Sequence, residues 1–479
     1  MTVFSGELRR SIEAGSPAQR TTDNLNFGTD AGRRAQLTGE STDDANAGTP
    51  TQRPAAIPLS PRVQVRAQRA ASAPVVFNPQ SADQLPQQNI AAEPVQSGTT
   101  ALEDADPFAP TGFRFGTFEG NASLEQTVGY SSNVSQNVGG EGGAFSQTDV
   151  QLDLVSNWSL HELRLGLDGS YRRPFDSDEI DQPRLGLNAA HRLDMIDGVT
   201  LTTSGFYTLQ TQQFTDSTLA PGAVDTPIIE NYGGSLELQR TGRKLQFSLR
   251  GGFEIESFAD ADLGTGLTGS QADLDNTEYE LALRVGYEVS PAITPFIEAQ
   301  IAQQVFDLSV DRNGNRRDND RFELLGGVAF DLGEKLQGEI AGGYVTQTFE
   351  DPLLADLDGF TLNGSLAWSP QRDTQVNLTL GTETNTSINA NESGSLIYRL
   401  GLAAERQVTD RLTVDARLDY QTETNDDGNT TFGVGAGMQY WVNRFTALTA
   451  DADYTSFTSD AVNSDFDEFS VRAGVRFQR

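Results

Sequence analysis

The sequence predicts an all-β protein, a transmembrane antiparallel up-and-down β-barrel of about 18 strands (16–18) that follows a disordered N-terminal tail. Three observations predict this class. Segments of about ten residues alternate apolar and polar side chains from Phe113 to the end of the chain. Short and long connections between these segments alternate along the chain. No run of about 18 apolar residues exists that could form a membrane helix, so only a closed barrel could cross a bilayer.

The charge and the cysteine count exclude several classes of function. The chain has 67 Asp and Glu residues against 34 Lys and Arg residues, a formal net charge of -33. A surface of this sign repels the phosphate backbone, so no nucleic-acid partner is expected. The absence of cysteine removes disulfides, thiolate nucleophiles and sulfur-ligated metals. We expect no cofactor.

Residues 1–112 differ in composition from the rest of the chain. They are rich in Ala, Gln, Pro, Ser and Thr and show no sustained period of strand or helix. Such a segment cannot bury enough apolar surface to offset its ordering entropy. We expect a disordered periplasmic tail over 1–112 and an outer-membrane barrel over 113–479. Residues 1–20 lack the apolar core of a secretory signal, so we expect a signal that was removed or that lies upstream.

The strands are predicted from alternation within each segment. Between Tyr279 and Val289, for example, apolar side chains alternate with Glu280, Arg284 and Glu288. The segments begin near Asn121, Thr148, Glu162, Arg184, Val199, Ile229, Leu245, Asn276, Thr294, Arg321, Leu336, Phe360, Thr374, Ser395, Leu412, Thr430, Arg444 and Asp467.

The connections predict which ends of the strands lie together. Tight turns are expected at 159–160, 290–293, 333–335 and 409–411. Longer polar loops are expected at 132–144, 216–227, 259–275, 308–320 and 458–466. Short turns on one side and long loops on the other are typical of outer-membrane barrels, and an even strand count places both chain ends in the periplasm.

Aromatic residues fall at the ends of the predicted strands. With the long loops outside the cell, two girdles are expected on the apolar face. Their predicted members are Tyr130, Tyr171, Tyr207, Tyr232, Tyr279, Tyr344, Tyr398, Tyr420 and Tyr454 at one rim, and Trp158 and Trp368 at the other. A soluble β-sandwich or a β-solenoid is the alternative. A sandwich does not need aromatics in register at strand ends, and a solenoid needs a fixed repeat length, which is missing here.

The polar face of the strands is expected to line a lumen. A barrel of about 18 strands is too wide for side chains to fill, so its interior holds water or a plug. Acidic residues outnumber basic ones there, which predicts a mild preference for cations. The alternative is that these charges only solvate and stiffen the wall. The predicted lumen-lining residues are Glu125, Asp149, Asp153, Arg164, Glu254, Glu280, Arg284, Glu323, Glu339, Arg399, Asp415, Arg417, Asp419, Asp451, Asp453 and Arg472.

Three passages, 106–134 (DPFAPTGFRFGTFEGNASLEQTVGYSSNV), 291–352 and 360–386, resemble the Putative β-barrel porin 2 family of Gram-negative outer-membrane proteins. The resemblance spans most of residues 106–479. It implies an outer-membrane barrel whose relatives are often linked to exopolysaccharide production or export. It supplies no catalytic residues.

The last strand resembles the C-terminal signal that the barrel-assembly machinery reads. The signal residues on one face are Phe469, Val471, Ala473, Val475 and Phe477. The chain departs from this pattern because it ends in Gln478 and Arg479 rather than in the aromatic residue itself.

An enzyme and a calcium site are two alternatives that the residues do not favour. An outer-membrane hydrolase needs a histidine beside a serine, and the two histidines lie at a predicted turn (His161) and on the apolar face (His191). The loop 311–323 has Asp311 at a ligand position. However, Arg316 stands where a calcium loop has glycine, and Phe322 stands where it has glutamate. Neither site is expected.

The predicted function is a porin-like channel, most simply a monomer, for small hydrophilic solutes or for exopolysaccharide export. The alternative is a structural or adhesive surface barrel whose lumen is closed by the glycine-rich loop 139–143 or by the tail. The expected partners are outer-membrane lipid and lipopolysaccharide, the barrel-assembly machinery and polysaccharide export components.

Overall fold

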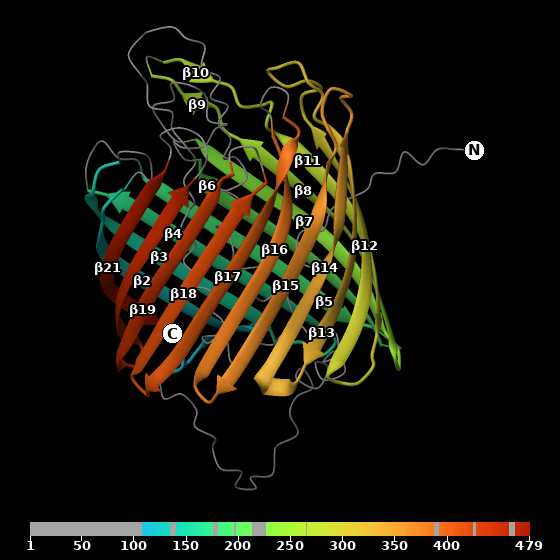
Figure 1. Ribbon diagram of the computed structural model, residues 1–479. Helices are drawn as coiled ribbons and strands as arrows, with labels where there is room; N and C mark the ends of the chain where they lie inside the picture. The colour runs from blue at the N-terminus through green and yellow to red at the C-terminus, as the bar shows by residue number, and fades with distance from the viewer. Residues whose placement is uncertain are drawn as a thin grey trace.

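A computed structural model of the protein describes residues 108–134, 140–175, 181–195, 198–212, 227–264, 266–387, 392–424, 428–458 and 465–479. Within these ranges the chain forms a closed antiparallel barrel of 18 strands (Figure 1). The barrel prediction is therefore confirmed, at the upper limit of the predicted strand number.

Every long strand pairs with its neighbour along the chain. The strands of the ring are β2 (Phe118–Ser131), β3 (Gly143–Ser156), β4 (His161–Pro174), β5 (Gln182–Asp194), β6 (Val199–Thr211), β7 (Ile228–Thr241), β8 (Leu245–Phe258), β11 (Asn276–Tyr287), β12 (Ile293–Phe306), β13 (Asn319–Asp331), β14 (Leu336–Phe349), β15 (Leu357–Gln371), β16 (Thr374–Thr386), β17 (Gly394–Thr409), β18 (Leu412–Glu423), β19 (Thr430–Asn443), β20 (Thr446–Thr458) and β21 (Phe466–Gln478).

The first and last strands close the ring. Strand β2 pairs with β21 from Ser123 opposite Gln478 to Ser131 opposite Ser470. A short strand, β1 (Phe113–Phe115), adds an antiparallel hairpin to the start of β2. Each strand of the ring is hydrogen-bonded to a neighbour on both sides, so the sheet has no open edge, which is the requirement for crossing a bilayer.

The two ends of the barrel differ in the length of their connections. At one end, the turn end, β15–β16, β17–β18 and β19–β20 are joined by 372–373, 410–411 and 444–445. At the other end, the loop end, longer connections such as 259–275 and 307–318 join the strands. A small hairpin of β9 (Ala261–Asp262) and β10 (Thr268–Gly269) lies within the first of these loops and stands above the ring (Figure 1).

The predicted strand starts agree with the structure to within a few residues. The largest difference is at β3, which begins at Gly143 rather than near Thr148. Phe145 explains this difference, because its buried side chain continues the ladder opposite Gly129 beyond the polar stretch where the alternation fades. The predicted loop 216–227 lies mostly outside the described residues.

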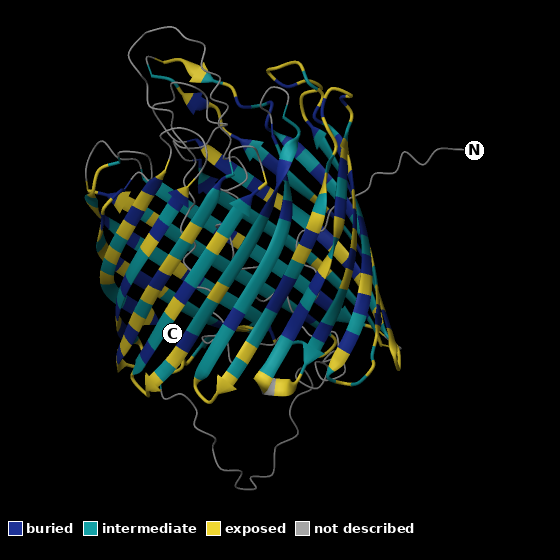
Figure 2. Ribbon diagram, in the orientation of Figure 1, coloured by how far each residue is buried: buried dark blue, intermediate teal, exposed yellow. Residues whose placement is uncertain are grey.

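Alternation along each strand divides the wall into two faces. In β11, Asn276, Glu278 and Glu280 are buried, whereas Leu283 and Val285 are exposed. The same alternation makes the chequered pattern of buried and exposed residues in Figure 2. The polar face therefore points into the barrel and the apolar face points out. Among the described residues, no helix is long and apolar enough to cross a membrane.

Candidate functional site

The candidate site is the inner wall of the barrel, where the alternation gathers the charged side chains. The structure places all the predicted lumen-lining residues on the inward face. The arginines of this face are Arg164, Arg172, Arg184, Arg192, Arg250, Arg284, Arg321, Arg399, Arg417, Arg472 and Arg476. Carboxylates outnumber them on the inward face of the same strands.

One group of ion pairs lies on the wall formed by β8, β11, β12 and β14. Arg284 Nη2 lies 2.6 Å from Glu339 Oε2, and Arg284 Nη1 lies 3.6 Å from Glu298 Oε2. Arg250 Nη2 lies 3.6 Å from Glu298 Oε1 and 3.8 Å from Glu280 Oε1. The group is therefore a chain in which each arginine bridges glutamates of different strands, as the forked guanidinium allows.

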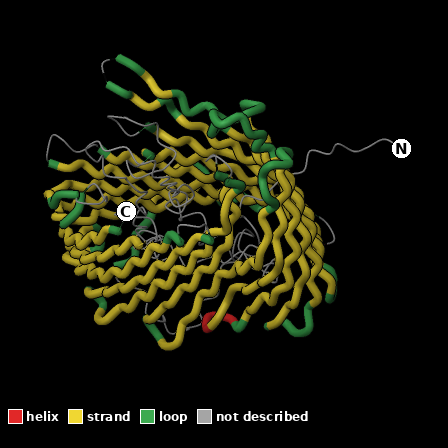
Figure 3. The backbone as a smooth tube through the Cα atoms, turned by 45° about the horizontal axis from the view of Figure 1, so that its top comes forward, coloured by secondary structure: helices red, strands yellow, loops and turns green. Residues whose placement is uncertain are grey.

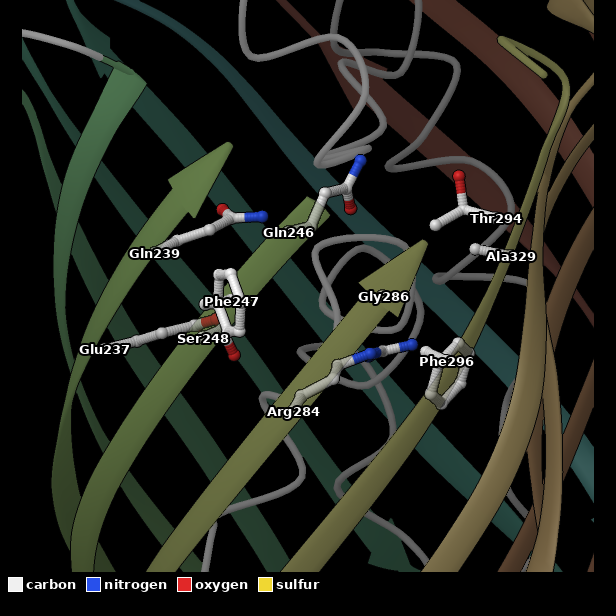
Figure 4. A pocket seen from close by; sticks show the side chains of 10 residues that line it. All are labelled: Glu237, Gln239, Gln246, Phe247, Ser248, Arg284, Gly286, Thr294, Phe296 and Ala329. Atoms are coloured by element: carbon white, nitrogen blue, oxygen red, sulfur yellow. The ribbon is translucent and has the colours of Figure 1, made fainter. Parts of the chain in front are cut away.

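A shallow cavity lies beside Arg284 (Figure 4). The guanidinium of Arg284 stacks on Phe296, with 3.4 Å between its Cζ and the ring centroid, and amide side chains such as Gln246 complete the lining. The volume is about 30 Å³, which admits water and is far below the several hundred Å³ of an ordinary small-molecule site. We therefore treat it as part of the wetted wall.

A second group of ion pairs spans β18, β20 and β21. Arg417 pairs with Asp453, and Arg472 Nε lies 3.4 Å from Asp451 Oδ2. Strand β19 runs between β18 and β20 and has glycine at the inward position 435. A Cβ there would lie 2.5 Å from Arg417 Nε and would also collide with Asp453. The glycine thus leaves the space in which an arginine and an aspartate two strands apart can meet.

Further pairs continue around the ring. Arg321 Nη2 donates to Glu278 Oε1 at 2.7 Å, Arg399 pairs with Glu383, and Arg476 Nη1 lies 3.7 Å from Glu125 Oε2. Glu278, Glu298 and Arg321 were not among the predicted lumen residues. Glu278 and Arg321 share the parity of their predicted neighbours Glu280 and Glu323, so a stricter use of the alternation would have included them. Glu298 lies on β12, where no lumen residue had been predicted.

The predicted girdle residues all lie on the outward face. At the loop end, aromatic residues stand opposite one another on adjacent strands. The register pairs are Tyr207 with Tyr232, Phe253 with Tyr279, Tyr344 with Phe360, Tyr420 with Phe432, and Tyr454 with Phe469. At the turn end, Trp158 packs edge-on against Phe118.

The predicted assembly-signal residues Phe469, Val471, Ala473, Val475 and Phe477 lie on the outward face of β21. Phe469 and Phe477 are each about half exposed. Gln478, which follows the signal, points the other way and donates to the carbonyl of Phe108 at 2.7 Å. The departure from the C-terminal pattern therefore has a structural use, because it ties the start of the described chain to the turn end.

Phe108 anchors this segment on the inward side of the turn end. Its ring stacks on the buried Trp441 with centroids 6.3 Å apart, and Arg411 Cζ lies 5.1 Å from its ring. The predicted boundary between tail and barrel was residue 112. Contacts with the barrel extend to Phe108, and the only sequence signal for this was the apolar residue in the motif 106–110 (DPFAP).

The two histidines lie together on the outward face near the turn end. Nδ1 of His161 and Nε2 of His191 are 3.2 Å apart, and the ring of His161 packs against Trp158. His191 lies on the apolar face, where the sequence placed it, whereas His161, which was predicted at a turn, is the first residue of β4. The sequence did not reveal their contact. Both side chains point away from the lumen, so they could not activate a serine nucleophile inside the barrel.

The loop 311–323, whose spacing partly resembles that of a calcium loop, is closed by its own side chains. Asp311 accepts the backbone N–H groups of Asn313 and Asn315 and the guanidinium of Arg317 at 2.8 Å. Arg317 is itself buried, which leaves this carboxylate engaged by the loop. Among the described residues, no group of three or more His, Asp or Glu side chains is arranged to hold a metal ion.

A bidentate contact ties this loop to the neighbouring one. Arg312 Nε and Nη2 donate to the two oxygens of Asp273 at 2.6 and 2.7 Å. Burial alone would raise the pKa of Asp273, but the bonds and the charge of Arg312 more than offset it and hold the pKa below its usual value. The loops at this end are therefore fastened to one another.

A closed ring of 18 antiparallel strands with an apolar outside, a charged inside and one set of long loops defines a porin-like β-barrel of the Gram-negative outer membrane. The chain belongs to the family described as Putative beta-barrel porin 2, which matches residues 106–479. The resemblance stated above is thereby confirmed. No curated relative matches the chain.

Solved structures that are similar to the chain include an outer membrane protein and a porin. The outer membrane protein opdK from Pseudomonas aeruginosa has 10% identity and a TM-score of 0.36, over 75% of this chain and 99% of that chain. A BenF-like porin from Pseudomonas fluorescens Pf-5 has 12% identity and a TM-score of 0.38, over 76% and 100%. OccK3 (OpdO) from Pseudomonas aeruginosa has 13% identity and a TM-score of 0.36, over 75% and 95%.

Proposed function

We propose that the protein is an outer-membrane channel for small hydrophilic solutes, with a lumen that mildly prefers cations. The observation that carries the proposal is the paired and acidic inner wall. Arginines such as Arg284 and Arg417 are engaged by carboxylates, and acidic residues such as Asp149, Asp153 and Asp419 add to the negative charge. A wall of this kind lowers the electrostatic barrier for cations.

An exported polysaccharide chain is the second candidate cargo. Amide side chains recur along the inner wall, among them Gln151, Gln300 and Gln439, and amides offer both donors and acceptors to sugar hydroxyls. Polysaccharide export components would then be partners, and the turn end and the tail would face the periplasm. A structural or adhesive barrel with a closed lumen is the remaining alternative.

Planar-bilayer recordings of the purified protein in a salt gradient test the proposal. We expect stepwise conductance and a reversal potential of the sign that cation preference gives. A matched variant, Asp149→Asn with Asp153→Asn, is expected to shift the reversal potential towards zero with little change in folding. Anion preference would contradict the lumen charge, and the absence of any current would contradict the channel.

Two further experiments ask whether the tail closes the lumen and which cargo passes through it. Phe108 lies at the turn-end mouth. A truncated variant that begins just before Phe108 therefore lacks the tail but keeps the contacts of Phe108 with the barrel. Current that appears only after this truncation would support a lumen closed by the tail. Loss of cell-surface polysaccharide on deletion, restored by the wild type, would favour export over general diffusion.

A further inference from the structure

Strands β15 and β16 separate at the loop end of the ring. They pair from Gln371 opposite Thr374 only as far as Gly364 opposite Leu380. On their other sides both strands stay paired: β15 with β14 to Leu357, and β16 with β17 to Thr386. The last half of β16, residues 381–386, has therefore left the wall, and we call it the infolded segment.

Side chains replace the main-chain ladder at the point of separation. The hydroxyl of Thr382 accepts the N–H of Leu362 at 2.9 Å and lies 3.1 Å from the carbonyl oxygen of the same residue. The N–H of Thr382 donates to Asn363 Oδ1 at 3.0 Å. The branch is thus held by two polar side chains, which explains how the strands diverge without leaving these groups unsatisfied.

Beyond the branch, the outward face of β16 meets the inner wall of other strands. The Thr386 hydroxyl donates to Gln304 Oε1 of β12 at 2.9 Å and accepts from Gln347 Nε2 of β14 at 3.1 Å. Arg321 Nη1 of β13 donates to Thr384 Oγ1 at 2.5 Å. These three partners point inward from strands that are not neighbours of β16 in the ring. The infolded segment therefore lies inside the barrel.

The sequence of β16 agrees with this placement. Val376, Leu378 and Leu380 occupy its outward positions in the half that belongs to the wall. The next positions of the same face are Thr382, Thr384 and Thr386. A lipid-facing strand would continue with apolar residues, whereas threonines suit a face that turns into a polar interior. The opposite face, with Glu383 paired to Arg399, lines the remaining passage.

The wall is closed behind the infolded segment by β17. The Tyr398 hydroxyl donates to the carbonyl of Phe360 at 2.7 Å, so β17 contacts β15 directly. Leu396 is 3% exposed and fills the space next to Gly359, where a Cβ would collide with its Cδ1. Tyr398, which the sequence assigned to the girdle, therefore also seals the place that β16 has left.

We propose that the infolded segment is the constriction that sets the largest solute the channel passes. The proposal rests on the channel function proposed above. A strand with its side chains occupies about 10 Å, the spacing of packed sheets, so the segment narrows the loop-end mouth by about that amount. Hydroxyl bonds to Gln304, Arg321 and Gln347 hold it in place.

The variant Thr384→Val with Thr386→Val tests this by removing those bonds while keeping side-chain size. We expect single-channel conductance to rise on the order of twofold, and larger sugars to enter liposomes in swelling assays, because the passage widens. Thr413→Val is the matched control, since it changes a buried, inward-facing threonine of β18 outside the infolded segment.

A cross-link decides the question even if the valine variant folds poorly. The chain has no cysteine, so Gln304→Cys with Thr386→Cys adds the only two thiols. We expect a bis-methanethiosulfonate linker to restore wild-type conductance, and its reduction to raise conductance again. Wild-type protein that conducts, with both variants conducting like Thr413→Val, would overturn the constriction. A protein that passes no current, either at full length or after removal of the tail, would instead overturn the channel.

Discussion

At the scale of single residues, the inner wall uses arginine rather than lysine as its basic residue. The chain has only two lysines, Lys244 and Lys335, and both lie at the turn end. Every basic residue on the inward face of the described strands is an arginine. A guanidinium offers five donors in a fixed plane and can serve two carboxylates at once, as Arg284 serves Glu298 and Glu339.

The glycine at position 435 makes one of these pairs possible, which leads to a prediction. In Gly435→Ala, the new methyl group occupies the space of Arg417 Nε and Asp453, so this pair should be displaced while the backbone stays in place. We expect the free energy of unfolding to fall by about 1–3 kcal/mol, which lowers the midpoint temperature of heat-induced unfolding. Gel-shift measurements of the folded barrel over a temperature series would show this.

Gly433→Ala is the matched control for that substitution. It adds the same methyl group two residues away on the same face, where the nearest atom is Asp419 Cβ at an ordinary 3.6 Å. We expect it to leave the unfolding midpoint unchanged. Equal effects of the two substitutions would mean that the ion pair is not the cause.

The sequence predicts faces better than it predicts partners. Alternation alone placed Arg417 and Asp453 on the polar side of their strands. It could not show that they meet across β19, because contact between alternate strands depends on the small residue between them. The contact of His161 with His191 was missed for a related reason, since register between two strands is set by the whole ladder.

At the scale of elements, the last strand gives a prediction about assembly. Phe477 lies on the outward face of β21 and is 50% exposed, so the folded barrel gains little packing from it within the chain. If the assembly machinery reads this residue, Phe477→Ala should sharply reduce the amount of folded barrel in cells. Leu448→Ala is the control, because Leu448 is equally exposed on the adjacent strand. Similar losses in both would argue against a signal.

The contact between two loops gives a prediction about pH. The pKa of Asp273 lies below its usual value in the folded protein. At a pH above about 4, the usual pKa of Asp in an unfolded chain, the bond to Arg312 therefore contributes its full stabilisation. This stabilisation is lost only as the pH falls through the lower pKa that Asp273 has in the folded protein. Protease cleavage of the loops should be equally slow at pH 7 and pH 5. Arg312→Gln should speed it at both.

That result has a control in a neighbouring arginine. Arg316 pairs with Glu350, and both side chains are about half exposed, so Arg316→Gln should change cleavage little. If cleavage of the wild type accelerates already between pH 7 and pH 5, the bond to Asp273 does not fasten the loops.

The path of β16 marks the limit of prediction at this scale. Its alternating pattern gave the right start, Thr374. The pattern could not show that half of the strand leaves the wall, because alternation continues past the branch, through Glu383 and Asn385. The three threonines at 382, 384 and 386 are a signal in hindsight, but isolated threonines are common at strand ends.

At the scale of the whole molecule, the two aromatic rims stand a constant distance apart. Tyr279 and Tyr287 are eight residues apart, as are Phe360 and Trp368, and Phe432 and Tyr440. Eight residues of strand span roughly 27 Å, or about 20 Å along the axis of a barrel whose strands tilt by about 40°. This is close to the apolar band of outer-membrane barrels.

The three tryptophans report on this arrangement. Trp158 and Trp368 lie on the outward face, whereas Trp441 is buried on the inward face. In proteins with a single tryptophan, the others being phenylalanine, brominated phospholipids should quench Trp158 and Trp368 strongly and Trp441 weakly. The measurement is tryptophan fluorescence in reconstituted vesicles. Strong quenching of Trp441 alone would mean that the faces are reversed.

The seam between β2 and β21 has a consequence for biogenesis. Ser123 and Gln478 stand opposite each other, so the ring closes only when β21 pairs with β2. Until then the sheet has two edge strands with unpaired backbone groups, and another extended polypeptide could pair with them. A sheet of this size held open by such a late contact is slow to mature. We therefore expect the unfolded chain to fold in higher yield in the presence of a holdase that shields those edges.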